Sequence, residues 1–113
     1  MRLLVVEDSP SQAARLQSVL ESEDYEVCVA VRGNQVLTMI EKEEPDLVIL
    51  DLKLPDRDGF DLCRDIKAAA GDRFLPVIML TVLGDVEENR FIIQARGQGR
   101  LFREQIARMA EKK

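Results

Sequence analysis

The sequence predicts a single α/β domain built on a parallel sheet that carries helices on both of its faces. Short apolar runs, typical of strands buried on both faces, alternate along the chain with segments whose apolar residues recur at helical spacing. The chain has 113 residues, and 46% of them are hydrophobic, which suits one globular core. We therefore expect one domain over residues 1–113 and no separate output domain.

Each expected element rests on a local pattern of apolar residues, caps and breakers. Strands are expected over residues 3–6, 27–31, 47–50 and 76–80. Helices are expected after Ser9-Pro10 across the stripe from Ala13 to Leu20, from Val36 to Ile40 before Pro45, from Gly59 to Gly71, over 85–94 and over 103–111.

Polar side chains follow three of the expected strands. Glu7 and Asp8 come directly after strand 3–6, Asp51 comes directly after strand 47–50, and Thr81 closes strand 76–80. Because parallel strands end at the same edge of a sheet, three carboxylates and one hydroxyl should converge there. Such a set of hard oxygen ligands suits Mg²⁺, which keeps several waters. The pattern predicts a metal site with Asp51 as a nucleophile beside it.

These residues also have purely structural interpretations. Glu7 and Asp8 could favour the start of the following helix through its dipole. Asp58, before Gly59, is typical of a helix cap. The combined spacing favours the functional interpretation of the strand-end acids and of the hydroxyl. The remaining charges of the loop after Asp51 are expected to be solvated: Lys53, Asp56 and Arg57.

Three motifs in this order resemble the receiver domain of two-component response regulators: "LLVVEDSP", "PDLVILDLKLPDRDGFDLCRDIK" and "PVIMLT", in a match that runs in register to about Asn89. The resemblance implies a flavodoxin-like, three-layer α/β/α fold. It also implies that a sensor histidine kinase or a histidine phosphotransfer protein donates a phosphoryl group to Asp51. The other implied roles are Mg²⁺ binding by Glu7, Asp8, Asp51 and the backbone carbonyl of Lys53, and a switch hydroxyl at Thr81.

The resemblance fails after the fourth expected strand. The family's usual Lys followed by Pro is not found, because no Lys lies between Lys67 and Lys112 and no Pro follows Pro76. No residue is therefore assigned as the catalytic Lys. We expect the fifth strand to be missing or irregular, which would leave strand 76–80 as an exposed edge and favour a homodimer.

Three functional classes remain open. The first is a phosphoacceptor in a phosphorelay that acts through protein–protein contact, with no enzymatic activity beyond Mg²⁺-dependent self-phosphorylation and dephosphorylation. The second is a pseudo-receiver, a binding module with impaired phosphorylation or switching, which the missing Lys favours. The third is an aspartyl-phosphate phosphohydrolase, which would need an Asp where Lys53 stands.

Composition bears on the partners and the cellular compartment of the protein. The net charge of −5 argues against a nucleic-acid partner and against a membrane surface. Cys28 and Cys63 both lie among apolar residues and are expected to be buried thiols in the reducing cytoplasm.

Overall fold

A computed structural model of the chain describes residues 1–51, 54–83 and 90–96. The expected alternation of strands and helices is confirmed through the fourth strand. The elements are β1 (Arg2–Val6), α1 (Pro10–Glu21), β2 (Glu26–Ala30), the 3-10 helix η1 (Gly33–Gln35), α2 (Val36–Glu43), β3 (Leu47–Asp51), α3 (Gly59–Ala70), β4 (Val77–Leu83) and β5 (Arg90–Arg96).

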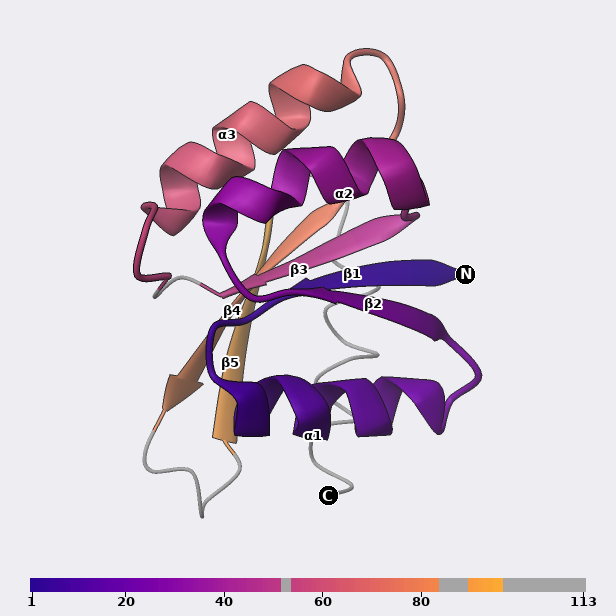
Figure 1. Cartoon of the computed structure of the whole chain (residues 1–113), viewed down its shortest axis with the longest axis vertical. Coiled ribbons are helices and arrows are strands. Elements are labelled where there is room, and N and C mark those ends of the chain that lie inside the picture. The colour runs from indigo at the N-terminus through magenta and orange to yellow at the C-terminus, as the bar shows by residue number, and fades with distance from the viewer. Residues whose placement is uncertain (52–53, 84–89, 97–113) are drawn as a thin grey trace.

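The strands form one sheet in the order β2-β1-β3-β4-β5. The first four are parallel, and β5 is antiparallel to β4. Helix α1 covers one face of the sheet, and α2 and α3 cover the other (Figure 1). The expected three-layer, flavodoxin-like α/β/α fold is therefore confirmed. None of the described helices is long and apolar enough to cross a bilayer.

The core is divided by the central strands, whose successive side chains point to opposite faces. Leu4 and Val48 pack in the cluster that includes Ile66 of α3, on the face covered by α2 and α3. Leu3 and Ile49 pack in the cluster that includes residues of α1. Because both faces of these strands are covered, they read as uninterrupted apolar runs rather than as an alternation.

The structure corrects the expectations for the C-terminal third. A helix was expected over 85–94, but residues 90–94 belong to β5, which pairs with β4 from Val77↔Arg96 to Leu83↔Arg90. The run Phe91-Ile92-Ile93 explains the strand, because aromatic and β-branched residues favour extended backbone. The fifth strand is present but runs opposite to the other four. The helix expected over 103–111 lies outside the described residues.

Strand β4 is also not the exposed edge that the sequence suggested. It pairs with β3 on one side and with β5 on the other. The expected homodimer was inferred from a free β4 edge, so that reason for expecting it no longer holds. In the described part of the sheet, β5 and β2 are the outer strands.

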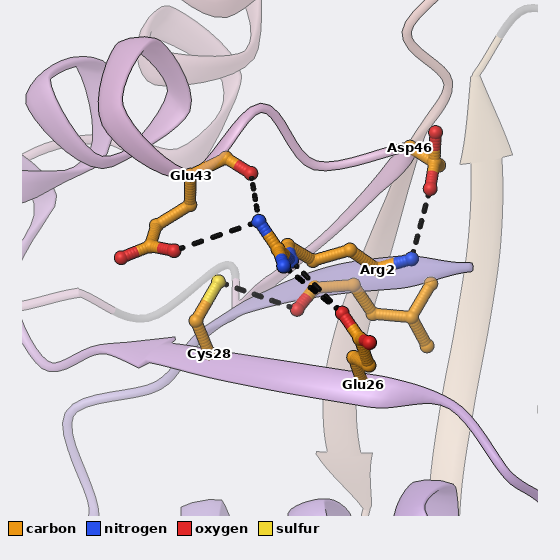
Figure 2. Close-up of polar contacts among 6 residues, drawn as sticks. Arg2, Glu26, Cys28, Glu43 and Asp46 are labelled. Atoms are coloured by element: carbon orange, nitrogen blue, oxygen red, sulfur yellow. Dashed lines mark hydrogen bonds and ion pairs between the residues drawn. The ribbon is translucent and has the colours of Figure 1, made fainter.

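Arg2 holds three segments together at the amino-terminal end of β1 (Figure 2). Its backbone N–H donates to Asp46 Oδ2 at 2.8 Å. Its guanidinium donates to Glu26 Oε2 at 3.0 Å and to the carbonyl oxygen of Glu43 at 2.8 Å. These contacts join β1 to the start of β2 and to the chain between α2 and β3. The network lies at the edge opposite to the strand-end acids.

The two cysteines differ in burial. Cys63 on α3 is buried, as expected. Cys28 on β2 is only half-buried, and its Sγ donates a hydrogen bond to the carbonyl oxygen of Leu3 at 3.5 Å.

Candidate metal site

The candidate site lies where β1 and β3 end side by side. The chain leaves β1 toward β2 and returns to β3 on the other side of β1, and such a switch point opens a crevice at the carboxyl ends of the strands. Val6 is opposite Leu50 in the parallel pairing, and the next residue along the chain is an acid in both cases, Glu7 after Val6 and Asp51 after Leu50. One ligand oxygen from each of Glu7, Asp8 and Asp51 lies within 4.8 Å of the other two. The structure thus brings together the three acids that the sequence singled out.

Burial separates the three acids. Glu7 is only 2% exposed and Asp51 only 7% exposed, whereas Asp8 is exposed. The backbone N–H of Glu7 donates to the carbonyl oxygen of Ala30 at 3.0 Å, and its Oε1 accepts from the backbone N–H of Ser9 at 3.0 Å. Glu7 is therefore fixed both by its main chain and by its side chain.

The electrostatics of the site favour a cation. Burial raises the pKa of Glu7 to about 8, the nearby Asp51 carboxylate acts in the same direction, and the hydrogen bond from Ser9 opposes the shift. A metal-free site therefore keeps a proton on Glu7 near neutral pH. A divalent cation bound there would offset the cost of burying the charged Glu7 carboxylate and its repulsion from Asp51, and so would lower the pKa of Glu7.

The donor set fits Mg²⁺ in particular. Its ligands are hard carboxylate oxygens, and Asp8 on the exposed side leaves room for the waters that this ion retains. Glu7, Asp8 and Asp51 are the residues that would hold the ion.

The other two predicted site residues are placed less completely. Thr81 was expected to close its strand, but β4 continues to Leu83. The pairing with β5, in which Thr81 is opposite Ile92, extends the strand past that point. Leu80 is opposite Asp51, so the backbone of Thr81 lies one residue beyond the level of Asp51 on the neighbouring strand. Lys53 lies outside the described residues, and the roles of Lys53 and Thr81 stay predictions.

Two loop charges were expected to be solvated, and Asp56 is exposed and Arg57 partly exposed, but both also have defined partners. Both carboxylate oxygens of Asp56 accept hydrogen bonds, from the backbone N–H groups of Gly33 and Asn34, each at 2.9 Å. Arg57 forms an ion pair with Asp65 on α3. The sequence signal was the Gly33-Asn34 pair, which offers free N–H groups where a helix begins. Nothing in the sequence indicates which distant acid would accept from them.

Comparisons with known sequences identify the family. The family model described as the response regulator receiver domain matches residues 3–110. The DNA-binding response regulator MtrA of Mycolicibacterium smegmatis is 44% identical over 84 residues, which are 74% of this chain and 36% of MtrA. The response regulator PleD of Caulobacter vibrioides is 38% identical over 82 residues, which are 73% of this chain and 18% of PleD. The chain thus spans about a third or less of these relatives.

A solved structure agrees with the sequence relatives. The BeF3-activated N-terminal receiver domain of Klebsiella pneumoniae RstA superposes with a TM-score of 0.67 at 35% identity. The superposition covers 79% of this chain and 74% of the RstA chain. The chain therefore belongs to the response regulator receiver domain family.

Proposed function

We propose that this receiver domain accepts a phosphoryl group on Asp51 in a cytoplasmic two-component phosphorelay. The observation that carries the proposal is the meeting of Asp51 with Glu7 and Asp8 at the carboxyl ends of β1 and β3. Asp51 ends a strand whose five residues are all buried, so its position is held by the core. A fixed nucleophile beside a cation site is what phosphoryl transfer to a carboxylate needs.

The proposed chemistry is an exchange of one phosphorus bond for another. An Oδ atom of Asp51 attacks the phosphorus of a phosphohistidine, the new O–P bond forms, the P–N bond breaks, and the electron pair stays on the donor imidazole. The chain contains no His, so the phosphohistidine belongs to a sensor histidine kinase or a histidine phosphotransfer protein. Bound Mg²⁺ supplies positive charge that offsets the charge on the transferred group.

The other residues of the proposed site bind the cation or respond to the phosphoryl group. Glu7, Asp8 and Asp51 hold the cation, with the backbone carbonyl of Lys53 as a further ligand. Hydrolysis of the acyl phosphate by water then returns Asp51 to its free carboxylate. Thr81, one residue past the partner of Asp51 on β4, is the switch hydroxyl of this proposal.

The output of the signal is a separate question. We expected no nucleic acid among the partners because of the chain's negative charge. That expectation does not fit a relative called a DNA-binding response regulator. The charge of this chain bears only on the third of such a protein that it matches. Protein–protein contact of the receiver remains the proposed route by which phosphorylation is transmitted.

The test is phosphorylation by a small phosphodonor. The purified chain is incubated with acetyl phosphate and Mg²⁺, and its intact mass is measured. We expect one added phosphoryl group on the parent protein, none after removal of Mg²⁺ with EDTA, and none on Asp51→Asn. Asp46→Asn is the matched control, since Asp46 is an exposed acid bound to Arg2 at the opposite edge of the sheet. Labelling of Asp51→Asn to the parental level would refute the assignment.

A further inference from the structure

Two hydrogen bonds join the loop after β3 to the chain that connects β2 with α2. Asp56 lies five residues after Asp51, and its Oδ1 and Oδ2 accept from the N–H groups of Gly33 and Asn34. Because both oxygens are engaged, the orientation of the carboxylate is fixed. The hydrogen bond from Gly33 is the main cause that lowers the pKa of Asp56, so the group is ionised at neutral pH. Asp56 is exposed, so solvent screens these charge-assisted bonds, and their geometric restraint matters more here than their strength.

The same two segments are also in close packing contact. A Cβ added at Gly33 would lie 3.1 Å from Cβ and Cγ of Arg57 and 3.2 Å from Oδ1 of Asp56. Gly33 is buried, and the side chains of Asp56 and Arg57 lie close against it. An alanine at this position would require these side-chain atoms to shift by a few tenths of an ångström.

A second contact links the β2–α2 connection to the other acids of the site. The backbone N–H of Glu7 donates to the carbonyl oxygen of Ala30, the last residue of β2. Ala30 precedes Gly33 by only three residues. A path of chain and hydrogen bonds therefore runs from Glu7 through Ala30 and Gly33 to Asp56, which lies five residues after Asp51.

Two other polar contacts of this loop are made with α3, the next helix in the sequence. Arg57 pairs with Asp65 on α3, and Asp58 caps the first turn of α3. Both contacts hold the loop to the helix that follows it in sequence. The bonds of Asp56 differ because they cross to a neighbouring strand–helix unit.

We propose that Asp56 is a positioning residue for the metal site. The β1–β3 pairing already holds the backbones of Asp51 and of the Glu7-Asp8 pair side by side. By bonding to the β2–α2 connection, Asp56 adds a further restraint on the separation between their carboxylates. Mg²⁺ demands near-ideal octahedral geometry, so its affinity depends on that separation. Asp56 itself does not bind the ion. This inference rests on the proposed function and adds a residue to it.

The first experiment measures Mg²⁺ binding in full-length variants. The readouts are the Mg²⁺-induced rise in Tm and the Mg²⁺ concentration that gives half-maximal labelling by acetyl phosphate. We expect Asp56→Ala to bind Mg²⁺ more weakly than the parent, by less than the roughly tenfold that loss of a group bonded directly to a metal ligand costs. Its labelling rate at saturating Mg²⁺ should match the parent, and Asp56→Asn, which keeps one acceptor oxygen, should fall between the two. Asp61→Ala, the control for loss of a nearby exposed acid, should match the parent.

The second experiment reaches the same contact from the other side. Gly33→Ala keeps the Asp56 side chain in the protein but crowds its Oδ1 and the side chain of Arg57. We expect it to weaken Mg²⁺ binding, and we expect the double variant with Asp56→Ala to lose little more than either single variant. Such non-additivity is the signature of two residues acting through one contact.

The outcomes separate positioning from a merely structural role. A structural role predicts that Asp56→Ala lowers Tm equally with and without Mg²⁺ and leaves Mg²⁺ affinity unchanged, and this result would overturn the inference. If the parent binds Mg²⁺ and takes up phosphoryl while Asp56→Ala has parental affinity, only this inference fails. If the parent does neither, the proposed function and this inference fall together.

Discussion

At the scale of single residues, Glu7 links the site to the stability of the fold. Its pKa is about 8 in the folded protein, against an ordinary value of 4.5. Between these values the folded state holds a proton that the unfolded state has lost, so the free energy of unfolding falls as pH rises. Without metal, we expect a fall of up to about 1.4 kcal/mol per pH unit in this window.

Urea unfolding in EDTA across this pH range measures the effect. The variant Glu7→Gln cannot ionise at this position, so its unfolding free energy should change much less between pH 5 and pH 8. Parallel pH profiles for the parent and Glu7→Gln would show that the titration of Glu7 does not govern stability.

Asp8 gives a second prediction at this scale. It is the exposed member of the acidic cluster, so Asp8→Ala removes a metal ligand with little loss of packing. The variant should show a smaller Mg²⁺-induced rise in Tm. Without metal it should be as stable as the parent or more stable, because repulsion between carboxylates is relieved. Thermal melts with and without Mg²⁺ test this against Glu41→Ala, an exposed acid on α2. A parental metal response in Asp8→Ala would remove Asp8 from the site.

At the scale of elements, the start of α3 depends on one side chain. Asp58 Oδ1 accepts from the backbone N–H of Phe60 at 2.8 Å and of Asp61 at 3.3 Å, as an N-cap does. Asp58→Ala should lower the free energy of unfolding by about 1 kcal/mol, whereas Asp58→Asn, which can still cap, should lower it less. Urea unfolding compares the two. Equal losses for both variants would show that charge rather than capping matters here.

The elements also show what a sequence can and cannot predict. The central strands were predictable because a run such as 47–50, apolar on both faces, has few alternatives to a buried parallel strand. Residues 90–94 were misassigned to a helix because the consecutive apolar residues Phe91, Ile92 and Ile93 do not separate a strand from a helix by periodicity. Their partner β4 decides the matter, and that pairing is a tertiary contact.

The candidate site also has a part that the sequence predicts and a part that it does not. Glu7, Asp8 and Asp51 were predictable because strand ends converge by topology, without knowledge of any side-chain conformation. The partners of Asp56 were not, because two loops far apart in sequence meet only in the folded chain.

At the scale of the whole molecule, phosphorylation of Asp51 can act on a partner only if its effect reaches the rest of the sheet. The sequence has no Lys between Lys67 and Lys112, so the phosphoryl group lacks the family's usual ammonium partner. The loss of one charge-assisted hydrogen bond removes roughly 1.5–3 kcal/mol of preference for the switched state. Amide exchange should therefore change little across β5 when a beryllofluoride mimic is added with Mg²⁺. Strong new protection of residues 90–96 would show that the switch survives without the Lys.

The central claim is that the buried carboxylate at the end of β3 is the phosphoacceptor. An acyl phosphate is reduced by borohydride to an alcohol, so phosphorylated Asp51 becomes homoserine and can be located by peptide mass spectrometry. After treatment with acetyl phosphate and Mg²⁺, the account predicts homoserine at position 51, and no homoserine in EDTA. A phosphorylated parent protein whose homoserine lies at another acid, or at none, would contradict it.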